Sequence, residues 1–316
     1  MANNTTLVTR KKKHGFRNAK MYMALYSMMI PGIIYLIINN YIPMFGLQIA
    51  FKKFNYADRM WKSPWTGLSN FTYLFKTKDA LIMTRNTLLY NLTFILLGTV
   101  FAVAIAIMLN ELRSAKAKKL YQVLFLIPYL ISIVVVSYIV FAFLSYDNGF
   151  INNSLIKPMG GQAVNWYVEP KYWPFILVIV NLWKGFGYSS IIYFATVIGI
   201  DTALYEAAVI DGATPWQRTW HVTLPGLKTT IITMTLLNVG RIFYSDFGLF
   251  YQVPQNSGPL SAVTTTIDVY VYRGLTQLND VGRSSAAGFY QSVVGFILVL
   301  VANLIVRKLD EESALF

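Results

Sequence analysis

The residues best suited to chemistry in this chain lie inside long apolar stretches, where a polar side chain is costly. Lys184 stands within one such stretch, in the sequence NLWKGFGYSSIIY. A lysine at mid-membrane depth costs a few kcal/mol, so it should face a bundle interior or a wet cavity. Trp183 and Tyr188 flank it, and aromatic faces beside hydrogen-bonding groups suit a sugar, which presents apolar CH faces and a rim of hydroxyls.

The next apolar stretch repeats this pattern, with Asn238 and Arg241 one helical turn apart. Their spacing would let both side chains line one cavity. The sequence therefore predicts a substrate path lined by Trp183, Lys184, Tyr188, Asn238 and Arg241. The alternative is that Lys184 reaches toward the outer membrane surface while the aromatic residues form an interfacial belt.

Catalytic and metal chemistry find no support in the sequence. It contains no P-loop, no Gly-x-Ser-x-Gly and no His-Glu-x-x-His pattern. With two histidines and no cysteine, neither a histidine-based metal site nor a thiolate site is expected. We predict no enzyme activity, no metal and no cofactor in this chain, so any ATP and Mg²⁺ would have to bind a partner.

Composition indicates a membrane protein. Of the 316 residues, 55% are hydrophobic and 13% charged, whereas soluble domains carry about 25% charged residues. The formal charge of +13 could suggest nucleic acid. Most of it flanks apolar segments, however, and this placement favours membrane topology over a nucleic-acid partner.

Apolar runs of about 20 residues predict an all-α protein with six membrane spans. The expected divisions are a basic tail at 1–20, one transmembrane domain at 21–306 and a tail at 307–316. The spans are expected near 21–44, 86–110, 120–146, 173–200, 227–250 and 284–306, with a polar insert at 201–226 between the fourth and fifth. The first run is too long for a cleaved signal peptide, and no suitable cleavage site follows it.

Lysine and arginine counts predict the orientation. Six lie in the amino tail and four between Arg113 and Lys119, which favours both termini and the 201–226 insert on the cytoplasmic side. Seven between Phe45 and Arg85 oppose this assignment. The many aromatic residues of that segment indicate a structured interfacial element rather than a free loop.

The insert at 201–226 carries helix-boundary signals of its own. Asp201 or Thr202 can cap a helix that runs to Ile210, and Gly212 stands where a left-handed C-terminus favours glycine. Thr214 then opens a second helix, with Pro215 at its first position and Gln217 three residues after the cap. We expect Pro225 to end that helix. Leu204, Ala207 and Ala208 share one face, and their small side chains would admit a partner closely.

This insert resembles the EAA loop of binding-protein-dependent ABC importer permeases. The matching residues are Glu206, Ala207, Ala208, Asp211, Gly212, Ala213, Leu224 and Pro225, while Val222 replaces the usual isoleucine. The resemblance implies that Glu206, Ala207, Ala208, Asp211, Gly212 and Ala213 couple the chain to an ATPase. It also supports the cytoplasmic placement of the insert.

Two other segments resemble the carbohydrate branch of that family: WTGLSNFTYLF at 65–75 and the closing helix and tail from Ala286. The resemblance implies a permease subunit in the cytoplasmic (inner) membrane of a bacterium, importing an oligosaccharide or polysaccharide fragment by alternating access. Expected partners are a second homologous permease, two cytoplasmic ATPase subunits, an extracytoplasmic sugar-binding protein and the lipid bilayer. The competing hypotheses are a self-sufficient secondary transporter for a small polar solute and a membrane enzyme acting on lipid-linked sugars.

Overall fold

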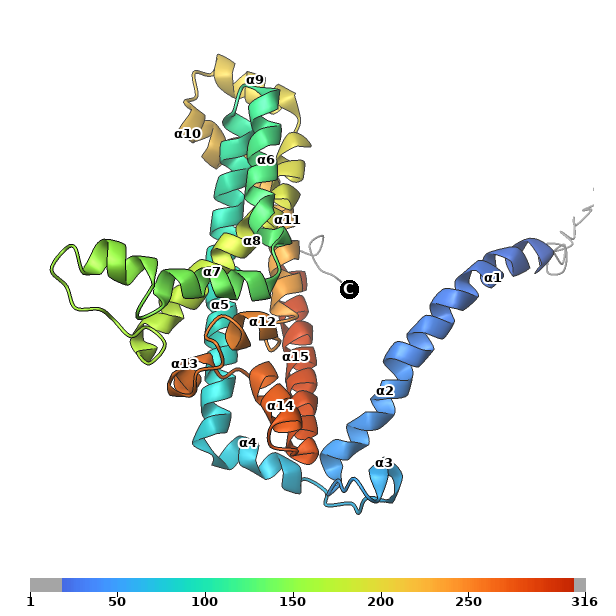
Figure 1. Ribbon diagram of the computed structural model, residues 1–316. Coiled ribbons are helices and arrows are strands. Elements are labelled where there is room, and N and C mark those ends of the chain that lie inside the picture. Colours follow the sequence, from blue (N-terminus) through green and yellow to red (C-terminus); the bar gives the residue numbers. More distant parts are fainter. Residues whose placement is uncertain (1–18, 310–316) are drawn as a thin grey trace, which may run out of the picture.

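The computed structural model describes residues 19–309, and its regular elements there are helices (Figure 1). Five helices are long and apolar enough to cross a membrane, and a bent pair would make a sixth. The all-helical membrane fold expected from the sequence is confirmed. Most of the basic tail at 1–20 and of the tail at 307–316 lies outside the described residues.

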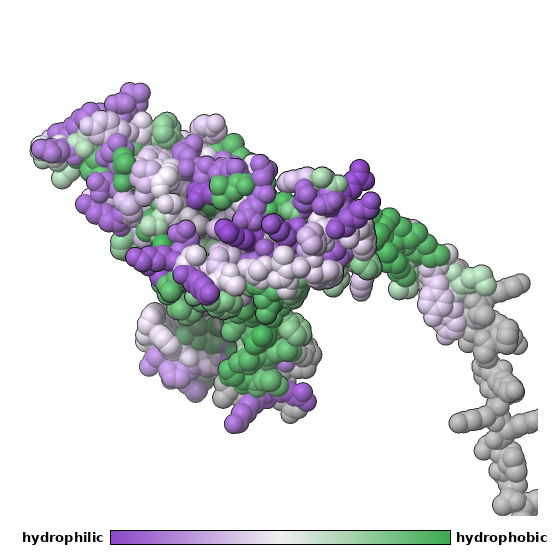
Figure 2. Space-filling model, turned by 90° about the horizontal axis from the view of Figure 1, so that it is seen from below, coloured by the Kyte–Doolittle hydropathy of each residue, from purple (hydrophilic) through white to green (hydrophobic). Residues whose placement is uncertain are grey.

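The amino-terminal helix stands apart from the rest of the chain (Figure 1). It runs through α1 (Ala19–Leu36), η1 (Ile37–Tyr41), α2 (Ile42–Met44) and η2 (Phe45–Phe51), and only η2 packs closely against the bundle, on α15 (Val281–Leu309). None of the apolar window of this arm is buried. Viewed from below, the arm is mostly hydrophobic while hydrophilic residues gather over the adjoining face (Figure 2). An all-round apolar helix of this kind suits lipid or another membrane helix.

The bundle is built on α5 (Lys78–Glu111) and α8 (Trp173–Ile198), which pack along each other. Small side chains allow their close approach, because Ala102 and Ala106 of α5 are fully buried beside Tyr193 and Val197 of α8. The helices α6 (Ala115–Leu130), α11 (Leu224–Val239) and α15 complete the bundle. The α6–α8 contact depends on Gly187, where an added Cβ would collide with the Phe125 carbonyl of α6.

The span expected at 120–146 is a bent pair of helices rather than one continuous helix. The helix α6 ends at Leu130 and α7 (Ile133–Leu144) leaves it at 92°, so that α7 projects sideways from the bundle (Figure 1). Pro128 lacks an amide hydrogen and weakens the last turn of α6. The Ser132 hydroxyl then accepts from the Val134 amide and caps α7. We call this bend at 130–132 the elbow.

Three prolines in this fold each follow a π-helical turn. Each turn ends two residues before a proline. Pro43 follows η1, Pro158 follows η4 (Ile151–Ile156) and Pro225 follows η6 (Thr219–Thr223). Proline lacks an amide hydrogen, and its ring crowds the carbonyl four residues earlier in an α-helix. In a π turn each carbonyl accepts from the amide five residues later, so the crowded carbonyl has another donor. The expectation that Pro225 ends its helix is therefore wrong, because the helix runs continuously from Pro215 to Val239.

The fifth span ends earlier than the sequence suggested. A helix to 250 was expected, but α11 ends at Val239, and a turn over 240–246 leads into the short α12 (Phe247–Tyr251). The Asp246 carboxylate caps α12 by accepting from the Leu249 amide at 3.1 Å. This interruption leaves the chain free to place the side chains of the turn beside the bundle rather than along a helix.

Short helices occupy the two ends of the bundle (Figure 1). One end holds α9 (Thr202–Ile210), α10 (Pro215–Arg218) and η6. The half of the bundle toward the other end holds a second set of short elements. These are α3 (Arg59–Lys62), η3 (Ser69–Phe71), α4 (Thr72–Lys76), η7 (Gly258–Leu260), α13 (Ser261–Thr264) and α14 (Ile267–Thr276). The η5 turn (Pro170–Tyr172) leads into α8. The polar insert and the aromatic segment after the first span thus lie at opposite ends.

Candidate functional site

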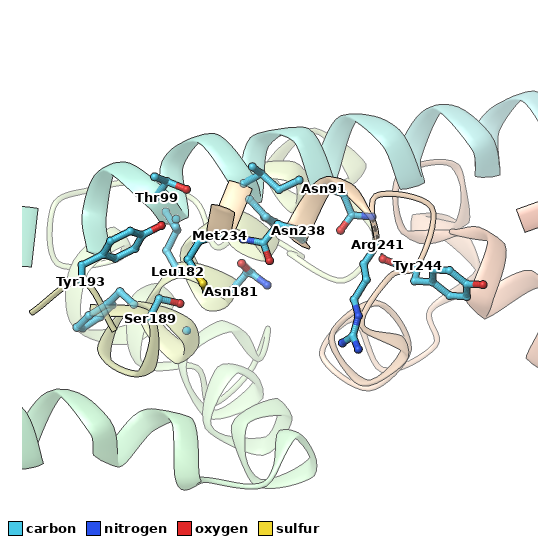
Figure 3. A pocket seen from close by; sticks show the side chains of 15 residues that line it. Asn91, Thr99, Asn181, Leu182, Ser189, Tyr193, Met234, Asn238, Arg241 and Tyr244 are labelled. Carbon is cyan, nitrogen blue, oxygen red and sulfur yellow. Dashed lines mark hydrogen bonds between the residues drawn. The ribbon is translucent and has the colours of Figure 1, made fainter. Parts of the chain in front are cut away.

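A cavity of about 250 Å³ opens between α5, α8 and α11. Its wall mixes amides, hydroxyls and aromatic rings with one cation (Figure 3). The lining residues that carry polar groups are Asn91, Thr99, Asn181, Ser189, Tyr193, Asn238, Arg241 and Tyr244. Gly98 and Gly185 also line it, and nothing lies within 4 Å of where a Cβ would stand at either position. These two glycines widen the cavity.

The structure places two of the five predicted path residues in this wall. Asn238 comes from the end of α11 and Arg241 from the turn that follows (Figure 3). Trp183, Lys184 and Tyr188 are not among the lining residues. Their role in a substrate path stays a prediction that no contact with this cavity supports.

Lys184 instead binds the elbow. Its ammonium donates to the carbonyl oxygens of Tyr129 at 3.0 Å and Ile131 at 2.8 Å. The last carbonyls of a helix lack a following turn to accept from, and they form the negative end of its dipole. Tyr188 stacks on Tyr129 with ring centroids 4.4 Å apart. Lys184 and Tyr188 therefore join α8 to the bend between α6 and α7.

The cavity face of α8 was missed in the sequence because the most conspicuous residues lie on another face. Asn181, Gly185, Ser189 and Tyr193 repeat every four residues and line the cavity, whereas Lys184 and Tyr188 lie about 100° further round the helix. On α5 the residues Asn91, Ile95 and Gly98 form a similar stripe. Sorting each span by helical face, rather than by residue type, would have found both stripes.

The turn that carries Arg241 is fixed from three helices. The Asn91 amide of α5 donates to the carbonyl oxygens of Ile242 at 2.9 Å and Tyr244 at 3.1 Å. The Asp268 carboxylate of α14 accepts from the Ser245 amide at 2.7 Å. Gln291 of α15, nearly buried, donates to the Phe243 carbonyl at 2.6 Å and to Asp268. These bonds fix the backbone of the turn from which Arg241 extends.

The insert at 201–226 has the predicted helix–turn–helix form. The Asp201 carboxylate accepts from the Ala203 amide and starts α9. Gly212 has φ of +75°, a left-handed conformation that favours glycine. Thr214 and Gln217 form a reciprocal capping box, with Pro215 at the start of α10. The local signals in this part of the sequence were sufficient to predict its structure.

The six predicted coupling residues lie together on this exposed insert. Ala208, Asp211, Gly212 and Ala213 line one hollow, between α9 and the start of the following helix. Glu206 lines a neighbouring hollow with Ile210, whose side chain is 86% exposed. Ala207 is exposed on α9. The Tyr205 hydroxyl lies 3.0 Å from the Thr223 hydroxyl and holds α9 against η6. The insert is thus an ordered projection with small and apolar residues on its surface.

A helical membrane protein with a polar cavity among its spans and an ordered helical projection at one end has the architecture of a transport component. The chain belongs to the family of binding-protein-dependent transport system inner membrane components, whose family model matches residues 98–311. It is a multi-pass permease subunit of a binding-protein-dependent ABC importer in a bacterial inner membrane. This class is not itself catalytic, and ATP is hydrolysed on its partner subunits.

Known proteins match almost the full length. The chain is 34% identical to Protein LplB of Bacillus subtilis (strain 168), over 92% of this chain and 90% of that protein. It is 33% identical to the polygalacturonan/rhamnogalacturonan transport system permease protein YteP of the same organism, over 92% and 89%. A crystal structure of a bacterial ABC transporter involved in the import of the acidic polysaccharide alginate matches with a TM-score of 0.85 and 33% identity, over 93% of this chain and 98% of that one.

Proposed function

We propose that this permease subunit translocates an oligosaccharide or polysaccharide fragment. The cavity between α5, α8 and α11 carries the proposal, because it offers aromatic rings and side-chain amides together in the apolar part of the chain. Aromatic faces pack on the CH surfaces of a sugar, while amides and hydroxyls satisfy its hydroxyl groups. The transport functions of YteP and of the alginate importer agree with a saccharide substrate.

The proposed assembly contains a second homologous permease, two cytoplasmic ATPase subunits and an extracytoplasmic binding protein that delivers the sugar. The apolar arm that begins with α1 contacts the bundle closely only at η2, and the rest of it gives the chain a surface for lipid or for the second permease. The insert at 201–226 would dock on an ATPase and transmit its closure to the spans. Both termini and the insert would then lie in the cytoplasm.

Purification of a tagged chain from its own membrane tests this proposal against its two rivals. We expect a second permease and two ATPase subunits in fixed proportion, and ATP-dependent uptake of a saccharide when the complex and its binding protein are placed in proteoliposomes. A chain that purified alone and transported a solute on an ion gradient would be a secondary transporter. Turnover of a lipid-linked sugar without uptake would instead indicate a membrane enzyme.

A further inference from the structure

Arg241 is a cation that the described structure leaves without a partner. Within residues 19–309 its guanidinium has no ion pair and no side-chain hydrogen bond. Its side chain is exposed and extends from the turn beside the cavity (Figure 3). By contrast, the guanidinium of Arg273 on α14 binds the Asn256 side chain at 2.6 Å and 3.0 Å.

The position of Arg241 makes an unpaired charge expensive. Counting about 1.5 Å per residue, the end of α11 at Val239 lies roughly 22 Å along the helix from Leu224. That length places Arg241 within a hydrocarbon layer about 30 Å thick if the insert lies at one surface. An ionisable residue at such depth faces a cavity or a partner and marks a functional site.

The cavity around Arg241 carries no balancing negative charge. Its lining contains no aspartate or glutamate. The two nearest acidic residues in sequence are occupied elsewhere, since Asp246 caps α12 and Asp268 holds Ser245 and Gln291. The other polar lining groups, such as Asn181 and Asn238, are neutral. The cavity wall thus combines one positive charge with neutral groups suited to sugar hydroxyls.

We propose that Arg241 forms a carboxylate subsite, and that the saccharide carried by this permease is acidic. This inference rests on the proposed function and narrows its substrate class. A guanidinium donates two parallel hydrogen bonds to a carboxylate, a geometry that a neutral sugar cannot match. Asn91, Asp268 and Gln291 fix the backbone of the turn, so the point from which the Arg241 side chain extends is set before the sugar arrives.

Binding of two matched sugars to the purified complex in nanodiscs, without its binding protein, tests the subsite. The probes are trigalacturonate and its fully methyl-esterified form, which differ only in their charged groups. We expect the wild-type complex to bind the acid more tightly than the ester. Arg241→Gln should lower the affinity for the acid by about 10–100-fold and leave the affinity for the ester unchanged. Arg241→Lys, which keeps the charge but loses the planar fork, should fall between them.

Asn238→Ala provides the matched control, because it removes a neutral group from the same cavity wall and should lower the affinities for both sugars alike. Equal binding of acid and ester by the wild-type complex would overturn the subsite while leaving sugar transport intact. An equal loss of affinity for both sugars in Arg241→Gln would overturn the subsite as well. Loss of the second permease on purification of Arg241→Gln would show that Arg241 pairs with a subunit instead. Failure of the wild-type complex to transport any saccharide would refute the proposed function itself.

Discussion

Replacing Lys184 by methionine should loosen the elbow between α6 and α7. Methionine keeps the length and apolar stem of lysine but leaves the carbonyls of Tyr129 and Ile131 without the donor found at 3.0 Å and 2.8 Å. Hydrogen bonds between membrane helices contribute about 0.6–1.7 kcal/mol each. Two of them give an expected loss of about 1–3 kcal/mol in the packing of α6 and α7 on α8.

The lysine's insertion cost does not offset this loss. That cost of about 2.5–3.5 kcal/mol applies to α8 in the membrane whether or not α6 is packed against it, so it largely cancels between the packed and unpacked states. We therefore expect the apparent melting temperature of the purified complex to fall by roughly 2–10 °C. Lys184→Arg is the control, because it preserves a charged donor and should retain most of the stability.

Spin labels can report the elbow directly, since the chain has no cysteine of its own. Leu124 on α6 and Tyr146 just beyond α7 are 47% and 48% exposed and can take labels. Lys184→Met should broaden the distance distribution between them, whereas Lys184→Arg should leave it narrow. An unchanged distribution and melting temperature in Lys184→Met would refute the elbow role and return Lys184 to the substrate path or the outer interface.

Three further predictions use single residues with contrasting surroundings. Gly185→Leu should fill the cavity and block uptake with normal stability, while Gly187→Ala should destabilise the α6–α8 contact at Phe125; equal thermal stability of the two variants would contradict this. Gly212→Val should abolish coupling because φ is +75° there, whereas Gly212→Asn, which tolerates that conformation, should retain much of it in an assay of sugar-stimulated ATPase activity. Cysteine at the exposed Asn153 should react with an impermeant reagent on intact cells and cysteine at Gln217 should not; the reverse pattern would invert the topology.

Local signals in the sequence predicted local structure well. The left-handed Gly212, the Thr214–Gln217 capping box and the Asp201 cap each depend on residues within a few positions, and each is present in the structure. The helical type of the membrane spans followed from apolar length alone, but the expected number of six is reached only if the bent pair α6–α7 counts as one span. The family resemblance read from Glu206–Pro225 was confirmed by a match that extends over most of the chain.

Features that depend on contacts distant in sequence could not be predicted in this way. The elbow needs the Lys184 ammonium of α8 as the hydrogen-bond donor to the carbonyls of residues 129 and 131. The turn over 240–246 needs Asn91, Asp268 and Gln291 from three other helices. A lysine at membrane depth is rare, and in the structure the Lys184 ammonium binds the end of α6. Its role in a substrate path stays a prediction. Helical face, and not residue type, separates the residues that line the cavity from those that contact the elbow.

The most direct test of the central claim is the amount of ATPase retained by Ala207→Trp. Ala207 is exposed on α9, so an indole there should obstruct a close-fitting partner without disturbing the spans. We predict that a tagged Ala207→Trp chain reaches the membrane at the normal level and loses most of its co-purifying ATPase and its sugar uptake. Ala115→Trp, the same change at an exposed site outside the insert, should lose neither. Full ATPase retention and uptake in Ala207→Trp would contradict the claim that this insert is the docking element.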